Sequence, residues 1–180
     1  MAVPTLKTDR LVLRPLQHSD LDDLFEYAQD ADVYTMGMWQ PYESDRDARQ
    51  HLDELLSLYM KGLMWWAIEH KADRKMIGRI ELSHVDREDK HAEISYALNK
   101  SYWRQGIMSE GMERVINYAF NDMTLNRLYA RTLTDNEPSC KLLEKFNFQR
   151  EGHLREHSQV KGYPEDIYFY GLLKSDLTSS

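Results

Sequence analysis

A strand-like segment leads through a glycine-containing loop into a long amphipathic helix, and this order constrains the fold more than any other feature of the chain. From Ala92 to Leu98, apolar residues occupy every second position, which is the pattern of a half-buried strand. Beyond the loop, apolar residues recur at helical spacing from Met108 to Met123. The sequence therefore predicts a strand–loop–helix unit with Gly106 at the boundary.

The loop itself has features of an anion-binding turn. The start of a helix presents unpaired N–H groups, and Gly106 allows the backbone to approach a ligand closely. Arg104 could add a charge-assisted contact to phosphate. Neither the three-glycine dinucleotide pattern nor the P-loop pattern occurs here, so an ordinary strand-to-helix loop explains the segment equally well.

A second informative segment runs from Thr134 to Phe148. Asn136 is a good helix N-cap, Pro138 suits the first helical turn, and Asn147 can adopt the left-handed conformation that ends a helix. Local structure alone explains all three polar residues: Asn136 as a helix cap, Ser139 as a solvated residue of the first turn, and Cys140 as a small core residue.

Taken together, the glycine loop and the pattern Asn-x-x-Ser-x-x-x-Leu-Glu-Lys-x-x-Phe at 136–148 resemble the GNAT superfamily of acetyl-CoA-dependent N-acetyltransferases, and within it the RimJ/RimL-like branch. The resemblance runs from about Thr8 to Leu177. Further similar segments are Thr8–Leu16, Ile77–Gly78, Glu93–Tyr96, and the C-terminal Gly162, Tyr163 and Asp166.

The resemblance implies an α/β (α+β) fold: a central mixed, mostly antiparallel seven-stranded sheet, splayed between strands 4 and 5, with helices on both faces. Capping-box patterns predict helices at about Ser19–Gln29 and Ser44–Met60. Strands are expected near Arg10–Arg14, Leu63–His70, Lys75–Val85, His91–Leu98, Arg127–Leu133, Phe148–Leu154 and Asp166–Leu173.

Acetyl-CoA is the cosubstrate that the resemblance implies, with pantetheine in the splayed part of the sheet. The residues expected to bind it are Tyr96, Ala97, Leu98, Trp103, Arg104, Gln105, Gly106, Ile107, Met108, Ser109, Asn136 and Ser139. The chain departs from the family at three positions. Met108 replaces a small residue and is expected to begin the helix near the phosphate, while Ser95 and Asn147 replace glycines.

Direct acetyl transfer to an amine needs a neutral amine, a donor for the oxyanion and a way to stabilise the departing thiolate. The resemblance implies a backbone N–H near Leu98 for the oxyanion. Many GNAT enzymes carry a tyrosine seven residues after the asparagine, but here that residue is Leu143. The resemblance to the RimJ/RimL-like branch implies Ser139 as the thiolate donor instead, with Asn136 binding pantetheine or orienting the site. Glu81 and Glu93 are the candidate bases, although a partly solvated or salt-bridged strand residue is the slightly favoured explanation of each.

The acceptor is expected to enter beside the loop Val33–Tyr42, where Trp39 and Tyr42 could form an aromatic wall or simply pack in the core. A peptide or protein N-terminal α-amine is the preferred acceptor. The alternatives are a small amine such as a polyamine, amino sugar or amino acid derivative, or a silent acyl-CoA-binding module. A homodimer that completes the acceptor site is left open.

Composition narrows the remaining function classes. No linker or repeat divides residues 1–180, which predicts a single domain with its core at about 8–177. A formal net charge of −7 argues against a nucleic-acid partner. One cysteine, no apolar run of about 20 residues and no signal-peptide pattern favour a cytoplasmic protein without membrane contact. His153 and His157 lie on a strand-like segment, so no metal site is expected.

Overall fold

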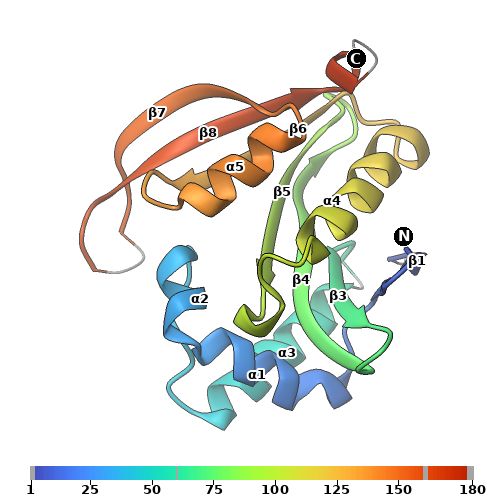
Figure 1. Cartoon of the computed structure of the whole chain (residues 1–180), viewed down its shortest axis with the longest axis vertical. Helices are drawn as coiled ribbons and strands as arrows, with labels where there is room; N and C mark the ends of the chain where they lie inside the picture. Colours follow the sequence, from blue (N-terminus) through green and yellow to red (C-terminus); the bar gives the residue numbers. More distant parts are fainter. Residues whose placement is uncertain (1–2, 60, 160–161, 178–180) are drawn as a thin grey trace.

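A computed structural model describes residues 3–59, 61–159 and 162–177, and its centre is one eight-stranded sheet (Figure 1). The strands lie in the order β1-β2-β3-β4-β5-β6-β8-β7. Their bounds are β1 Leu6–Lys7, β2 Leu11–Arg14, β3 Met64–His70, β4 Lys75–Asp86, β5 His91–Leu98, β6 Arg127–Leu133, β7 Gln149–Ser158 and β8 Glu165–Leu173. All seven expected strands are present, and the two-residue β1 was not predicted.

The sheet is antiparallel except between β5 and β6, which confirms the mixed, mostly antiparallel class. These two strands pair in parallel over only three positions, the last of which joins Glu93 to Tyr129. The rest of β5, from Ile94 to Leu98, pairs with β4 alone. The sheet is therefore splayed at the expected place, and one edge of β5 carries backbone groups that β6 does not engage.

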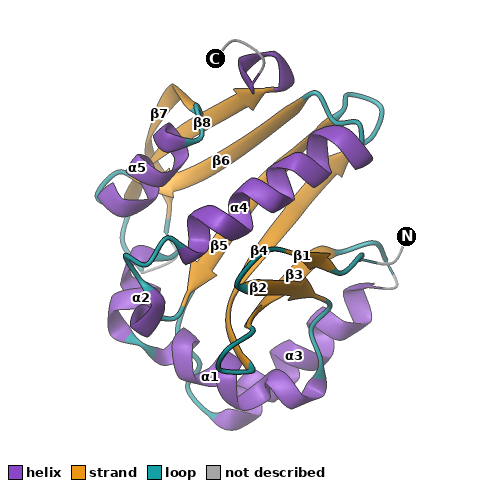
Figure 2. Cartoon of the chain, turned by 45° about the vertical axis from the view of Figure 1, so that its right-hand side comes forward, coloured by secondary structure: helices purple, strands orange, loops and turns teal. Residues whose placement is uncertain are grey.

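Helices cover both faces of the sheet (Figure 2). On one face lie α4, Ile107–Asn117, and α5, Glu137–Lys145. Here Met112 and Val115 are fully buried in the larger core cluster with Ile80 and Ile94. The other face packs against α1, Leu21–Gln29, and α3, Asp45–Tyr59, through a second buried cluster. The apolar stripes read from the sequence thus point toward the sheet from both sides.

Three local predictions need correction. The segment 33–42 is not entirely loop, because Asp30 caps a short helix α2, Ala31–Met36, by accepting hydrogen bonds from the N–H groups of Asp32 and Val33. The first long helix is preceded by a 3-10 turn, His18–Asp20, rather than starting at Ser19. Helix α4 ends earlier than the apolar pattern suggests and continues as a π-helical turn, Tyr118–Asp122. Met60, the expected end of the second helix, lies outside the described residues.

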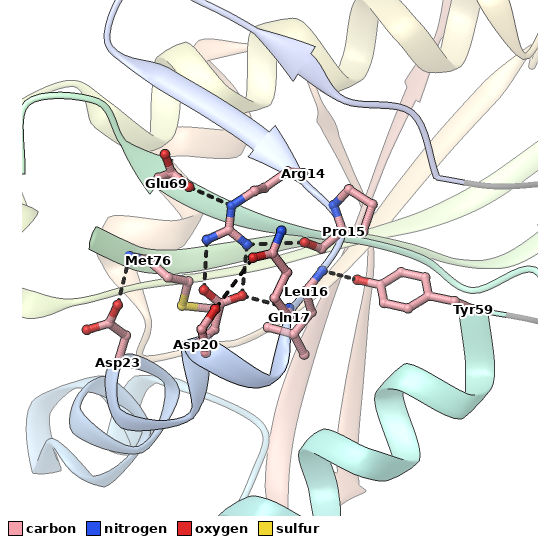
Figure 3. A network of polar contacts seen from close by, with 10 residues as sticks. Arg14, Pro15, Leu16, Gln17, Asp20, Asp23, Tyr59, Glu69 and Met76 are labelled. Atoms are coloured by element: carbon pink, nitrogen blue, oxygen red, sulfur yellow. Dashed lines mark hydrogen bonds and ion pairs between the residues drawn. The ribbon is translucent and has the colours of Figure 1, made fainter. Parts of the chain in front are cut away.

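A partly buried arginine explains why Asp20, and not Ser19, organises the start of α1 (Figure 3). The Arg14 guanidinium lies 2.7 Å from Asp20 Oδ1 and 2.6 Å from Glu69 Oε2. The same Asp20 carboxylate accepts a hydrogen bond from the backbone N–H of Gln17 at 2.8 Å. Because Asp20 is almost completely buried, its charge is stable there only with these partners. This network fixes α1 against β2 and β3.

Candidate active site

Gly106 forms the turn that opens α4. It is the N-cap of the helix with φ +73°, in the left-handed region that favours glycine, so the predicted boundary is confirmed. A Cβ atom at this position would lie 3.5 Å from Nη2 of Arg10. The Arg10 guanidinium also lies 2.8 Å from the carbonyl oxygen of Gln105 and 2.6 Å from Glu110 Oε2. The loop is thus held by an arginine from the first hairpin, which sequence reasoning did not assign to the site.

A second cation reaches the same helix start from α5. Lys145 Nζ lies 3.1 Å from Oγ of Ser109, in the first turn of α4. The positive end of a helix dipole disfavours nearby cations and favours anions, so Arg10 and Lys145 make this a suitable place for a diphosphate. Arg104 is exposed beside them with φ +59°. Lys145 belongs to the 136–148 pattern, so its position in that pattern is the sequence signal for this cation.

Met108 does not project into this phosphate-binding region. The helix begins at Ile107, one residue earlier than expected, so Met108 turns inward and is buried with Ile107 and Met112 in the larger core cluster. The Met108 side chain therefore lies in the core, four residues before Met112 on the buried face of α4, and its expected part in acetyl-CoA binding stays a prediction.

The free edge of β5 supplies the backbone part of the site. The N–H of Asn99 donates to the Ile77 carbonyl oxygen of β4 at 2.7 Å. Because N–H groups alternate sides along a strand, the N–H of Leu98 points away from β4, toward the splayed side. The indole N–H of Trp103 donates to the Leu98 carbonyl oxygen at 2.8 Å and fixes the loop that follows. Ala97 faces the opposite side of the sheet, in the core cluster under α1 and α3.

Asn136, Ser139 and Tyr96 form a connected group where α5 begins. Asn136 Oδ1 accepts from the Ser139 N–H at 3.1 Å, which confirms the predicted cap, and its Nδ2 donates to the Met36 carbonyl oxygen at 2.7 Å. The Ser139 hydroxyl lies 2.9 Å from the Tyr96 hydroxyl. Burial raises the pKa of Tyr96 well above its usual value, so this phenol stays protonated.

A cavity of about 290 Å³ connects this group with the face of the sheet that carries the candidate bases. It lies between the end of α2, the strands β4, β5 and β6, and the start of α5. Its lining residues are Met36, Gly37, Met38, Trp39, Arg79, Glu81, Ser83, Glu93, Ile94, Ser95, Tyr96, Ala130, Arg131, Thr132, Leu133, Asn136 and Ser139. The structure thus brings Ser139, Glu81, Glu93, Tyr96 and Trp39 together.

The two candidate bases differ in their surroundings. Both oxygens of Glu93 are held by Arg131, at 2.7 and 3.0 Å, and Oε2 also lies 3.2 Å from Nδ1 of His84. Glu81 uses one oxygen, Oε2, which accepts from Arg79 at 3.1 Å and from Ser95 at 3.3 Å. Its Oε1 has no hydrogen-bond partner among the residues that the structure describes.

The two aromatic candidates for the acceptor wall are separated. Trp39 lines the cavity, and the guanidinium carbon of Arg79 lies 5.7 Å from its ring centroid. Tyr42 does not line the cavity; it stacks on Phe25, and its hydroxyl lies 2.6 Å from Nδ1 of His51. Burial raises the pKa of Tyr42 to about 12.

The group of side chains with the arrangement of a possible metal site lies away from the cavity. Within the described ranges, the one group that could hold a cation is Asp86, Asp89 and His91 at the β4–β5 turn, and none of the three lines the cavity. His153 is paired with Asp166, at 2.6 Å. Among the described helices, none has both the length and the apolar character needed to cross a bilayer.

Comparison with known proteins agrees with this geometry. Residues 10–149 match the family model described as an acetyltransferase (GNAT) domain. The chain is 34% identical to an uncharacterized N-acetyltransferase, p20, of Bacillus licheniformis, with 96% of this chain and 97% of that protein covered. It is 25% identical to the spermidine N(1)-acetyltransferase of Vibrio cholerae, covering 92% and 94%, and 25% identical to the ribosomal protein uS5-alanine N-acetyltransferase of Escherichia coli, covering 96% and 92%.

The fold is shared with solved structures as well. A GNAT-family acetyltransferase from Bacillus anthracis superposes with a TM-score of 0.84 at 23% identity, covering 96% of this chain and 99% of that one. The spermidine N-acetyltransferase from Vibrio cholerae, solved with CoA and spermine, superposes with a TM-score of 0.82 at 22% identity, covering 96% and 100%.

Proposed function

Because the chain belongs to the GNAT family of acetyltransferases, it is an N-acetyltransferase that uses acetyl-CoA, and we propose that its acceptor is the free α-amine of a peptide or protein. The observation that carries this proposal is the charge balance of the cavity. Each carboxylate on its wall is paired with an arginine, Glu81 with Arg79 and Glu93 with Arg131.

This balance fits an acceptor with a single positive charge. A polyamine carries several ammonium groups and is best bound by carboxylates that have no other cationic partner. In this cavity the arginines already pair with the carboxylates and would repel additional ammonium groups. Nη1 of Arg131 has no hydrogen-bond partner within the described part of the chain. Such an N–H group on the cavity wall suits the carbonyl oxygens that follow a peptide's α-amine.

The donor half of the site supports direct transfer. Pantetheine would run along the free edge of β5, with the diphosphate at the start of α4 near Arg10 and Lys145. The Leu98 N–H is placed to donate to the thioester oxygen as negative charge develops on it. Ser139 lies in the first turn of α5, where its hydroxyl and the positive end of the helix both favour a departing thiolate.

Glu81 is the better of the two bases for removing the amine proton, because one of its oxygens remains available. Glu93 holds Arg131 in place instead. An α-amine has a reference pKa near 7.7–8.0 and is roughly a tenth neutral at pH 7, so a weak base is sufficient. The amine attacks the carbonyl carbon, the C–S bond breaks, and of the two protons lost by the ammonium group one reaches sulfur and one reaches solvent.

Steady-state release of the CoA thiol tests the acceptor class. We expect kcat/KM for a tripeptide with a free N-terminus to exceed that for spermidine by about tenfold or more, equivalent to about 1.4 kcal/mol. The tripeptide contains a lysine, and the matched control is the same tripeptide with its N-terminus acetylated, so that only the lysine side-chain amine remains. Equal or faster turnover of spermidine, or of the blocked peptide, would contradict the proposal.

A small amine remains the second candidate, because a relative of similar identity is named as a spermidine acetyltransferase. The same panel distinguishes the two. We also propose a cytoplasmic location, since the lone Cys140 is a free thiol, as is usual in a reducing compartment.

A further inference from the structure

We propose that Tyr96 is a positioning residue for the departing thiolate and acts through the hydroxyl of Ser139. The inference rests on the proposed function. It answers a specific question raised by the sequence, since the position that holds a tyrosine in many GNAT enzymes holds Leu143 here. Leu143 is completely buried in the core and has no polar group to offer.

The geometry points to a phenol that comes from a strand instead of a helix. Tyr96 lies on β5, in the part of the strand that β6 does not pair with. Its hydroxyl is 2.9 Å from Ser139 Oγ, and both residues line the cavity. Ser139 is itself held by the Asn136 cap on its backbone N–H. The two hydroxyl groups are therefore fixed relative to each other before any ligand binds.

The direction of this hydrogen bond decides the chemistry. Either hydroxyl can donate. A phenol is the more acidic group, so Tyr96 is the better donor, and with Tyr96 donating, the Ser139 proton is free to point at sulfur. Hydrogen bonds in such a chain polarise one another, which makes the serine a stronger donor than it would be alone. Two hydroxyl groups in series thus compensate for the weakness of a single serine.

No proton needs to leave Tyr96 in this step. When the C–S bond breaks, the electron pair stays on sulfur, and the thiolate accepts a hydrogen bond from Ser139. The protein stabilises the anion, and the CoA thiol is completed by one of the protons released from the amine. Burial raises the pKa of Tyr96, which keeps the phenol protonated and able to donate throughout.

The ionisation of CoA bound to the enzyme tests this arrangement without turnover. A free thiol has a pKa near 8.5, and a hydrogen bond to the thiolate lowers it. We expect the ultraviolet absorbance of the thiolate to titrate about one unit lower in the wild-type complex than in free CoA. Tyr96→Phe and Ser139→Ala should each raise the pKa of the bound CoA thiol most of the way back to that of free CoA, a change of about tenfold in the thiolate-to-thiol ratio.

The double variant separates a coupled pair from two independent residues. If Tyr96 acts through Ser139, the double variant should lose no more of kcat than Ser139→Ala alone, because coupled neighbours are non-additive. Tyr170→Phe is the matched control, since Tyr170 is also a buried tyrosine whose hydroxyl donates to a side chain, Glu144 Oε1 at 3.0 Å. Tyr170→Phe should leave the pKa of the bound CoA thiol unchanged.

Each outcome decides one question. If the pKa of the bound CoA thiol is the same in Tyr96→Phe as in the wild type, the inference is overturned. If Tyr96→Phe does not fold, the same result in Ser139→Ala overturns it. Additive losses of kcat in the double variant overturn it as well. Absence of amine-dependent thiol release by the wild-type enzyme would instead overturn the proposed function, and the titration of bound CoA distinguishes that result from a failure of the Tyr96–Ser139 pair.

Discussion

The Arg131 guanidinium binds both carboxylate oxygens of Glu93, with Nε 2.7 Å from Oε1 and Nη2 3.0 Å from Oε2. Glu93 forms the last backbone pair between β5 and β6, and Arg131 lies two residues beyond its partner Tyr129. The ion pair therefore joins the two strands just where their backbones separate. A splayed sheet has lost hydrogen bonds at this point, and side chains take over the role of holding its two halves together.

Replacing Glu93 by Gln should lower the free energy of unfolding by about 1–3 kcal/mol, because the Arg131 charge loses its partner beside a buried position. The measurement is urea unfolding followed by circular dichroism. Glu137→Gln is the control, since its pair with Lys141 is exposed at both ends and surface pairs contribute little. Equal stability of wild type and Glu93→Gln would show that the strands do not depend on this pair.

Glu81→Gln should instead act on the reaction. We expect kcat/KM at pH 7 to fall about 100-fold, within the range of a general base. The deficit should shrink as the pH rises past 8, because solution then supplies more of the neutral α-amine. A pH profile with a peptide acceptor measures this. If Glu93→Gln shows the larger, pH-dependent loss and Glu81→Gln turns over normally, the two carboxylates have been assigned the wrong way round.

Gly106→Ala should weaken acetyl-CoA binding by roughly tenfold and destabilise the fold by about 1 kcal/mol, since φ +73° is strained for alanine. Gly62→Ala is a well-matched control, because Gly62 has φ +90° and a Cβ atom there would have no atom within 4 Å. Both variants carry the same kind of backbone strain. Isothermal titration should find normal acetyl-CoA affinity in Gly62→Ala only; equal affinities in both variants would remove the loop from the binding site.

Glu110 should make stability depend on acid pH. Burial acts to raise the pKa of Glu110, but hydrogen bonds from Thr8 and Arg10 outweigh it and leave the pKa below its usual value. A lowered folded pKa stabilises the protein above the unfolded value near 4.3, and that stabilisation is lost as the pH falls through the folded value. The difference in melting temperature between wild type and Glu110→Gln should thus be constant above about pH 5 and shrink as the pH falls below the unfolded value near 4.3. A difference that does not shrink at acid pH would contradict this linkage.

The parts of the molecule that sequence could predict are those set by local chemistry. Gly106 stands at the start of α4 as expected, Asn147 has the left-handed backbone expected of it, and Asn136 caps its helix. Each of these features depends on a residue type acting within a few positions of itself. The strand at 92–98 followed from its period-two pattern for the same reason.

The parts that sequence missed depend on contacts between distant segments. Arg10 reaches Gln105 across 95 residues, and Arg131 reaches Glu93 across 38. The sequence allows Glu93 to be a base or a salt-bridged residue, and the contacts with Arg131 support the salt-bridged interpretation. Met108 lies four residues before Met112, so the apolar pattern of the helix already placed its side chain on the core side, and the family comparison of the loop pointed the other way. Such outcomes need the register of the whole fold.

Trp39 and Tyr42 give the last prediction, because the sequence paired them and the structure separates them. Trp39→Ala should raise the acceptor KM about fivefold to tenfold, since it removes an aromatic wall and the ring beneath Arg79. The KM for acetyl-CoA should not change. Tyr42→Phe removes only a hydroxyl that contacts His51, outside the cavity, and should leave both constants unchanged. Bisubstrate kinetics with a peptide acceptor compare the two variants directly. A raised acceptor KM in Tyr42→Phe with a normal value in Trp39→Ala would mean that the acceptor enters on the α3 side of this loop, where Tyr42 meets His51.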